Sequence, residues 1–231
     1  MKAYPYICMY NRDIYLDMFR QSYVLNLFSD TSTRRIPHKR EGLVSACYGS
    51  IAVTGDNIID SIFRLQSVST SNACEIRGIR CSLSLANKYK NNFKVINIFS
   101  DSKVAVFSLR EYIHKWKLVN NEFYSNGNRV VNQELYIECY RLIQELSKTH
   151  IVNIFHQKGH IKQSNYNSLL LASDVFKKNN GILGEVDMNL IRYISLYNNY
   201  IDHTTRSTVN TTDLRHNIYQ DALSFYTNDY L

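Results

Sequence analysis

The stretch YVLNLFSD, residues 23–30, decides the fold, because it has the composition of a buried β-strand that ends in an acid. Residues 94–100 form a second strongly β-prone run, and it too is followed by an acid, Asp101. In open α/β sheets, functional sites lie beyond the carboxyl ends of the strands. If the two runs are parallel neighbours, we expect Asp30 and Asp101 to meet at one edge of the sheet.

The rest of the chain supplies further strands and helices around these two runs. Residues 45–54 and 58–68 are predicted strands, joined by the turn-forming sequence TGDN, so the first three strands form an antiparallel meander. A helix is predicted after Ser71 or Asn72, either of which can serve as its N-cap. Further helices are predicted at about residues 103–117, 132–148 and 167–178, and a fifth strand at residues 151–156. The order βββαβααβα predicts an α/β fold with a five-stranded mixed sheet and helices on both faces.

The predicted elements divide the chain into three parts. Residues 1–22 are a short N-terminal extension, and residues 23–180 contain all the elements of the predicted sheet. Residues 181–231 form a C-terminal extension with two helix-like stretches, at about residues 188–200 and 214–226. The extensions have no predicted role.

The composition limits the class of protein. Hydrophobic residues make up 45% of the 231 residues, which predicts a globular chain, and no apolar run approaches the length of a membrane helix. The N-terminus has no uninterrupted apolar core, so we expect no signal peptide, no membrane anchor and a cytoplasmic location. The five cysteines form no Cys-x-x-Cys pair, which argues against zinc and against a disulfide framework. The net charge of +7 favours a polyanionic partner. We also expect the chain to act as a monomer.

Two more acids extend the pair at the strand ends. Glu75 lies in the first turn of the helix after the third strand, and Asp174 lies on the last predicted helix of the central part. A single acid at a strand end is most often a cap or a turn residue, so only the whole set has meaning. Clustered carboxylates resist ionisation unless a cation is present, and Mg²⁺ prefers oxygen ligands. Two such ions can promote phosphodiester hydrolysis.

The neighbours of these acids carry a resemblance. The segments LFSDTS (27–32), YGSI (48–51), SNACEI (71–76), FSDS (99–102), YIHKWK (112–117), QKGH (157–160) and ASD (172–174) resemble, in the same order, segments of ribonuclease H of the bacterial type I class. The resemblance covers about residues 23–178. Each segment alone is weak, but the ordered set on the expected elements is a fairly strong signal.

The resemblance implies a fold, an activity and a metal site. It implies a ribonuclease H-like fold and an endonuclease that hydrolyses the RNA strand of RNA–DNA hybrids. Asp30, Glu75, Asp101 and Asp174 are implied to bind two Mg²⁺ ions, with Mn²⁺ as a substitute. His160, on a loop, is implied to help proton movement or product release.

Other residues are predicted to contact the hybrid. Lys115 and Lys117 are expected to face phosphates, and Trp116 between them is either a platform for the substrate or an anchor in the core. The remaining candidates can contact the sugar or the backbone, where the 2′-hydroxyl distinguishes RNA; they are Thr31, Ser32, Asn72, Ser102 and Asn132.

Two alternatives stay open. One is another nuclease of the same fold, such as a junction resolvase, a transposase-like enzyme or an exonuclease, although the QKGH and YIHKWK segments speak against it. The other is a non-catalytic hybrid-binding module, against which the intact acids argue. A hybrid-cleavage assay discriminates between them.

Overall fold

A five-stranded mixed sheet forms the centre of the protein, with the strand order β3-β2-β1-β4-β8. The computed structural model describes residues 13–35, 44–120 and 122–211. The strands are β1 (Val24–Arg35), β2 (Val44–Thr54), β3 (Asn57–Ser69), β4 (Val95–Ser100) and β8 (Ile151–His156). The first three strands are antiparallel, whereas β4 is parallel to both β1 and β8. The predicted mixed sheet is confirmed.

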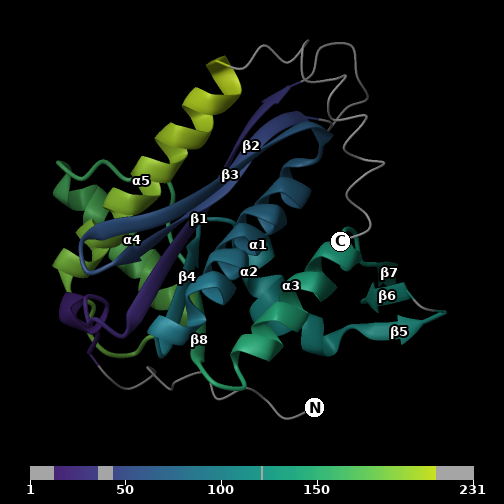
Figure 1. Ribbon diagram of the computed structural model, residues 1–231, viewed down its shortest axis with the longest axis horizontal. Coiled ribbons are helices and arrows are strands. Elements are labelled where there is room, and N and C mark those ends of the chain that lie inside the picture. The colour runs from purple at the N-terminus through teal and green to yellow at the C-terminus, as the bar shows by residue number, and fades with distance from the viewer. Residues whose placement is uncertain (1–12, 36–43, 121, 212–231) are drawn as a thin grey trace.

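Helices cover both faces of this sheet (Figure 1). On one face lie α1 (Ser71–Tyr89), α2 (Lys103–Phe107) and α3 (Gln133–Leu146), and on the other lie α4 (Tyr166–Asn180) and α5 (Met188–Thr211). Each face has its own hydrophobic core, because successive side chains of a strand point to opposite faces. None of the helices in the described ranges has the length of apolar sequence that crossing a bilayer requires.

The three parallel strands carry nearly the same sequence, and they pair in register. VLNLFSD (24–30) lies beside VINIFSD (95–101), which lies beside IVNIFHQ (151–157). The three asparagines therefore form a buried ladder, in which the Nδ2 of Asn97 donates to the Oδ1 of Asn26 at 3.0 Å and the Nδ2 of Asn153 donates to the Oδ1 of Asn97 at 2.9 Å. A shift of register would break both bonds, so the ladder specifies the alignment of the strands.

Two residues further along, the same face carries three phenylalanines. The ring centroids of Phe28 and Phe99 are 4.8 Å apart and those of Phe99 and Phe155 are 5.2 Å apart, with the rings nearly parallel in both pairs. Asp30 and Asp101 come two residues after Phe28 and Phe99 along the same two strand segments. The alignment of the apolar core thus brings the two acids side by side.

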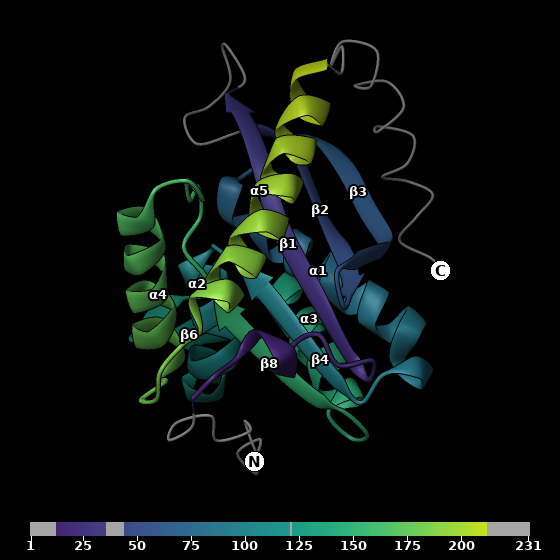
Figure 2. The same ribbon diagram turned by 90° about the vertical axis from the view of Figure 1, so that its left-hand side faces the viewer.

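Helix α5 crosses the outer face of β1 and β2 (Figure 2). The hydroxyl groups of Tyr193 and Tyr197 donate to the backbone oxygens of Gly55 and Asp56, in the turn between β2 and β3. The helix continues well past residue 200, where the predicted helix stopped. The predicted helix at residues 214–226 lies outside the described residues. Among residues 13–22, a short 3₁₀ turn (Leu16–Met18) packs against the same core as α5.

The segment after β4 agrees with the prediction in part. The helical segments expected at about residues 103–117 are found as α2, a π-helical turn (Ser108–Tyr112) and a 3₁₀ turn (Ile113–Lys115), which end two residues early. The chain then forms a separate three-stranded sheet from β5 (Lys117–Val119), β6 (Glu122–Ser125) and β7 (Asn128–Arg129), in a region where no strand was predicted. The Asn126-Gly127 pair explains the hairpin, because both residues have positive φ, as a tight two-residue turn requires.

Candidate active site

Three carboxylates converge where β1 and β4 separate. One oxygen each of Asp30, Glu75 and Asp101 lies within 4.8 Å of the others, and no other such group of His, Cys, Asp or Glu occurs in the described residues. Asp101 directly follows β4, and Glu75 lies near the start of α1, just after its first turn rather than in it as predicted. The convergence of these three acids, expected from the strand ends, is confirmed.

The strand that carries Asp30 does not end there, contrary to the prediction. The parallel pairing of β1 with β4 stops at Ser29 and Ser100, but β1 continues to Arg35 because β2 still pairs with it. Asp30 therefore lies on continuous strand at the point where its neighbour on one side ends. The N-cap of α1 is also one residue earlier than expected, since the hydroxyl of Thr70 accepts a hydrogen bond from the backbone N–H of Ala73 at 3.2 Å.

The pKa values of all three acids are raised in the absence of a cation. Burial, together with the charge of Asp101, raises the pKa of Asp30 to about 8. Burial and the charges of Asp101 and Asp30 raise the pKa of Glu75 to about 9. Burial also raises the pKa of Asp101. A bound divalent cation would offset both the desolvation and the mutual repulsion.

A fourth acid faces this triad from α5. The charge of Asp202 contributes to the raised pKa of both Asp30 and Asp101, so its carboxylate lies on their side of the helix. The side chain of Asp202 is only 19% exposed. The sequence prediction missed this residue, although the apolar positions Leu190, Ile194 and Ile201 have the spacing of a buried helix face that continues past residue 200.

The predicted fourth ligand lies elsewhere. Asp174 is on α4, its side chain is exposed, and it is not part of the carboxylate group. Helix α4 lies beside α5 rather than above the ends of β1 and β4 (Figure 2). The structure therefore brings Asp202, and not Asp174, towards the triad.

The loop that carries His160 is held against both the triad and α5. The Nδ1 of His160 is 3.5 Å from an Oδ2 of Asp202, and a charge on this imidazole lowers the pKa of Asp101. A Cβ on the preceding residue, Gly159, would lie 2.2 Å from the Oδ2 of Asp101, so any larger residue there would displace the Asp101 carboxylate. On the other side, the Nδ2 of Asn199 donates to the backbone oxygen of Ile161 at 2.8 Å.

Four predicted substrate-binding residues lie next to the acids on the same elements. Thr31 and Ser32 follow Asp30 on β1 and are half-buried. The backbone N–H of Thr31 donates to the Asp30 carboxylate, and its hydroxyl is buried with no partner among the described residues. Asn72 lies in the first turn of α1, and Ser102 caps α2 by accepting from the N–H of Ala105.

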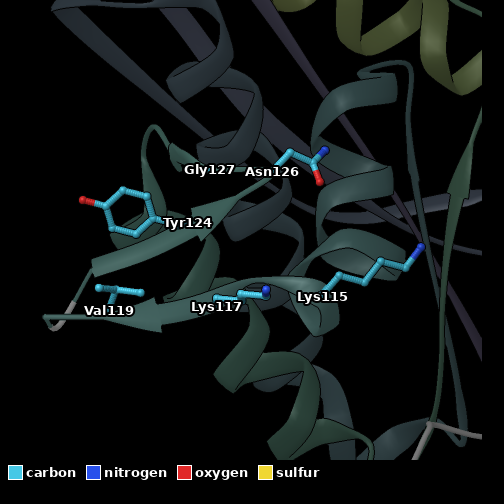
Figure 3. A pocket seen from close by; sticks show the side chains of 6 residues that line it. All are labelled: Lys115, Lys117, Val119, Tyr124, Asn126 and Gly127. Carbon is cyan, nitrogen blue, oxygen red and sulfur yellow. The ribbon is translucent and has the colours of Figure 1, made fainter.

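The other four predicted residues lie at or near the small sheet. Lys115 and Lys117 are exposed and line a pocket of about 340 Å³ with Val119, Tyr124, Asn126 and Gly127 (Figure 3). This sheet lies at the end of the molecule opposite α5 (Figure 1).

Trp116 and Asn132 have packing roles that the sequence left open. The Trp116 ring is half-buried and meets the Tyr136 ring edge to face at 5.4 Å, which favours the core-anchor interpretation over the platform. Asn132 precedes α3 with a φ of 58°, and its Nδ2 is buried with no partner in the part of the chain that the structure describes.

The strand order, the two helical layers and the carboxylates at the junction of β1 and β4 define a ribonuclease H-like fold. The sequence model of the family described as RNase H matches residues 22–175, which is more than half of the chain. The chain belongs to the RNase H family. No curated protein matches it.

The chain is similar to several solved structures of RNase H domains. The RNase H domain of prototype foamy virus is 14% identical with a TM-score of 0.50, over 72% of this chain and 98% of that one. RNase H1 from the halophilic archaeon Halobacterium salinarum is 18% identical with a TM-score of 0.40, over 58% and 86% of the two chains. An N-terminal RNase H domain from Mycobacterium tuberculosis is 19% identical with a TM-score of 0.41, over 68% and 96%. Helix α5 lies beyond the residues that the family model matches. The placement of Asp202 near the triad is therefore supported by the structure alone.

Proposed function

We propose that this chain is an endonuclease that hydrolyses the RNA strand of RNA–DNA hybrids with the help of two divalent cations, Mg²⁺ or Mn²⁺. The observation that carries the proposal is the carboxylate triad of Asp30, Glu75 and Asp101, within 4.8 Å, in a chain of the RNase H family. We further propose that Asp202 takes the place of Asp174 as the fourth ligand, because its charge acts on Asp30 and Asp101.

The donor set fits the proposed cations. The triad and Asp202 all offer carboxylate oxygens, the ligands that Mg²⁺ and Mn²⁺ prefer, and no described His or Cys belongs to the triad itself. Glu75 and Asp101 are half-buried, which leaves one side of the group open to a phosphate. When bound, a pair of such ions activates water and stabilises the charge on the leaving oxygen of a phosphodiester.

The protein's own residues would position the hybrid and move protons. His160 is 70% exposed on the loop beside Asp202, where its imidazole can accept or donate a proton. Thr31, with its unpartnered buried hydroxyl, and Ser102 flank the acids and can contact the RNA sugar. These residues would orient the scissile phosphate against the carboxylates.

The lysines of the small sheet would bind the hybrid away from the cleavage point. Lys115 and Lys117 present two exposed ammonium groups at one pocket (Figure 3), and such groups bind phosphates without reading sequence. Their position opposite α5 implies that the substrate is long enough to reach both ends of the molecule. We also predict that the chain acts as a monomer in the cytoplasm.

The test is cleavage of a labelled hybrid by the purified chain, with single-stranded RNA and double-stranded DNA as control substrates. We expect RNA in the hybrid to be cut only with Mg²⁺ or Mn²⁺, and we expect Asp101→Asn to abolish cutting while circular dichroism shows a folded protein. Normal cutting by Asp101→Asn would refute the site.

A matched pair of variants tests the fourth ligand. Asp202→Asn should reduce cleavage strongly, whereas Asp174→Asn should retain it, because only Asp202 faces the triad. The reverse result would return the role to Asp174. If the wild-type chain binds hybrid but never cuts it, the non-catalytic module is the correct function; if it cuts only another nucleic acid, the chain is a different nuclease of this fold.

A further inference from the structure

On helix α5, the guanidinium of Arg206 forms an ion pair with Asp202, the proposed fourth metal ligand. The Nη2 of Arg206 donates to the Oδ1 of Asp202 at 2.8 Å and to its Oδ2 at 2.9 Å, one helical turn away. The imidazole of His160 faces the same carboxylate at 3.5 Å. Both oxygens of Asp202 are therefore engaged by the protein's own cation.

This guanidinium acts on the triad as well as on its partner. Burial and the charges of Asp101 and Asp202 raise the pKa of Asp30, and the charge of Arg206 lowers it. The Arg206 side chain is 55% exposed, so it can move into solvent without leaving a buried charge. The cluster thus has one positive charge that is permanent at any pH and is carried by an exposed side chain.

We propose that Arg206 is an internal counter-ion that competes with the second metal ion for Asp202. Among the described residues, Arg206 forms an ion pair with Asp202, whereas no Lys or Arg forms an ion pair with Asp30, Glu75 or Asp101, so Arg206 acts on the triad only through its more distant charge on Asp30. An ion that binds through Asp202 must displace Arg206 from both oxygens or share them with it, and like charges repel at this range. The two ions should therefore bind with different affinities, the weaker step being the one that involves Asp202.

This inference rests on the metal site proposed above, and it is tested by metal binding rather than by activity. The full chain is titrated with Mn²⁺ by electron paramagnetic resonance and calorimetry, in the wild type and in the Arg206→Gln variant. We expect two binding steps in the wild type, and in the variant a weaker step that tightens about tenfold while the tighter step changes less than about twofold. Added salt should shrink the difference.

Two control variants separate competition from a structural role. Arg206→Lys keeps a cation and should resemble the wild type more than Arg206→Gln does. Arg192→Gln removes an exposed arginine of the same helix whose side chain donates to the nearby Asn189, and it should leave both steps unchanged. If Arg206→Gln weakens the second step or leaves it unchanged, Arg206 positions Asp202 or does nothing, and the inference is overturned.

A measurement on the wild type does not depend on the folding of any variant. The guanidinium signals of Arg206 in an NMR titration with Mg²⁺ should change during the second binding step, when the side chain leaves Asp202, and not during the first. Signals that stay constant through both steps would overturn the inference. If the wild type binds no Mn²⁺ or Mg²⁺ at all, the proposed function fails with it; if two ions bind and Arg206 has no effect, only the inference fails.

Discussion

Replacing Glu75 with Gln removes an acid that the metal-free protein holds mostly protonated. Burial and the charges of Asp101 and Asp30 raise the pKa of Glu75 from 4.5 to about 9. Between these values the folded chain binds a proton that the unfolded chain releases. The free energy of unfolding of the metal-free wild type should therefore fall as the pH rises through this window.

The size of the effect follows from one proton. A single group contributes a slope of at most about 1.4 kcal/mol per pH unit, or roughly 2–3 kcal/mol between pH 6 and pH 8. Glutamine is neutral throughout, so Glu75→Gln should gain stability over the wild type by up to this amount across the interval. Glu134→Gln, at an exposed position in the first turn of α3, should follow the wild-type pH dependence.

The assay is urea unfolding at pH 6, 7 and 8 in the presence of a chelator, repeated with Mg²⁺. Magnesium should stabilise the wild type more at pH 8 than at pH 6, and it should stabilise Glu75→Gln less than the wild type at either pH. Parallel pH curves for the wild type and Glu75→Gln in the chelator would refute the reasoning, because they would mean that Glu75 is already charged in the folded, metal-free protein.

The remaining predictions concern the loop, the ladder and the small sheet. Gly159→Ala should weaken Mn²⁺ binding and cleavage while changing the unfolding midpoint little, because its Cβ would lie 2.2 Å from a ligand oxygen of Asp101; unchanged Mn²⁺ affinity would contradict this. Asn97→Leu should lower the free energy of unfolding by about 2–4 kcal/mol, since two buried partners lose their hydrogen bonds, and a loss below about 0.5 kcal/mol in urea unfolding would show that the ladder does not stabilise the sheet. The double variant Lys115→Ala, Lys117→Ala should weaken hybrid binding and reduce the slope of log K against log salt by up to about 2, measured by fluorescence anisotropy; an unchanged slope would remove the small sheet from the interface.

The sequence predicts the sheet and the triad well because both depend on local patterns. The runs that end near Asp30 and Asp101 are apolar and β-prone, and the strand at residues 151–156 is found with the predicted bounds. The repeated pattern of the three parallel strands is an additional signal that predicts their pairing directly. Its copies are separated by unequal lengths of chain, so the pattern does not form a repeat of fixed period.

The fourth acid and the small sheet are harder to predict, for different physical reasons. Asp202 is brought to the triad by the packing of α5 across β1 and β2, which is a tertiary contact with no local sequence signature. Asp174, by contrast, has suitable neighbours in sequence but lies on an exposed face of α4. The hairpin of the small sheet has a local signal in Asn126-Gly127, yet its strands are too short for a clear alternation of polar and apolar residues.

The matching sequences of β1 and β4 make the packing of the core and the alignment of the proposed metal ligands depend on the same strand register. Sliding β4 by one residue past β1 would turn its asparagine and phenylalanine towards α1, and sliding it by two would set an amide against an aromatic ring. Only the observed register of β4 against β1 pairs the asparagines with each other and the phenylalanines with each other. The same register makes Asp30 and Asp101 neighbours. A misaligned and inactive form would therefore be too unstable to accumulate, so that nearly every molecule that reaches the native state has its two strand-borne ligands in place.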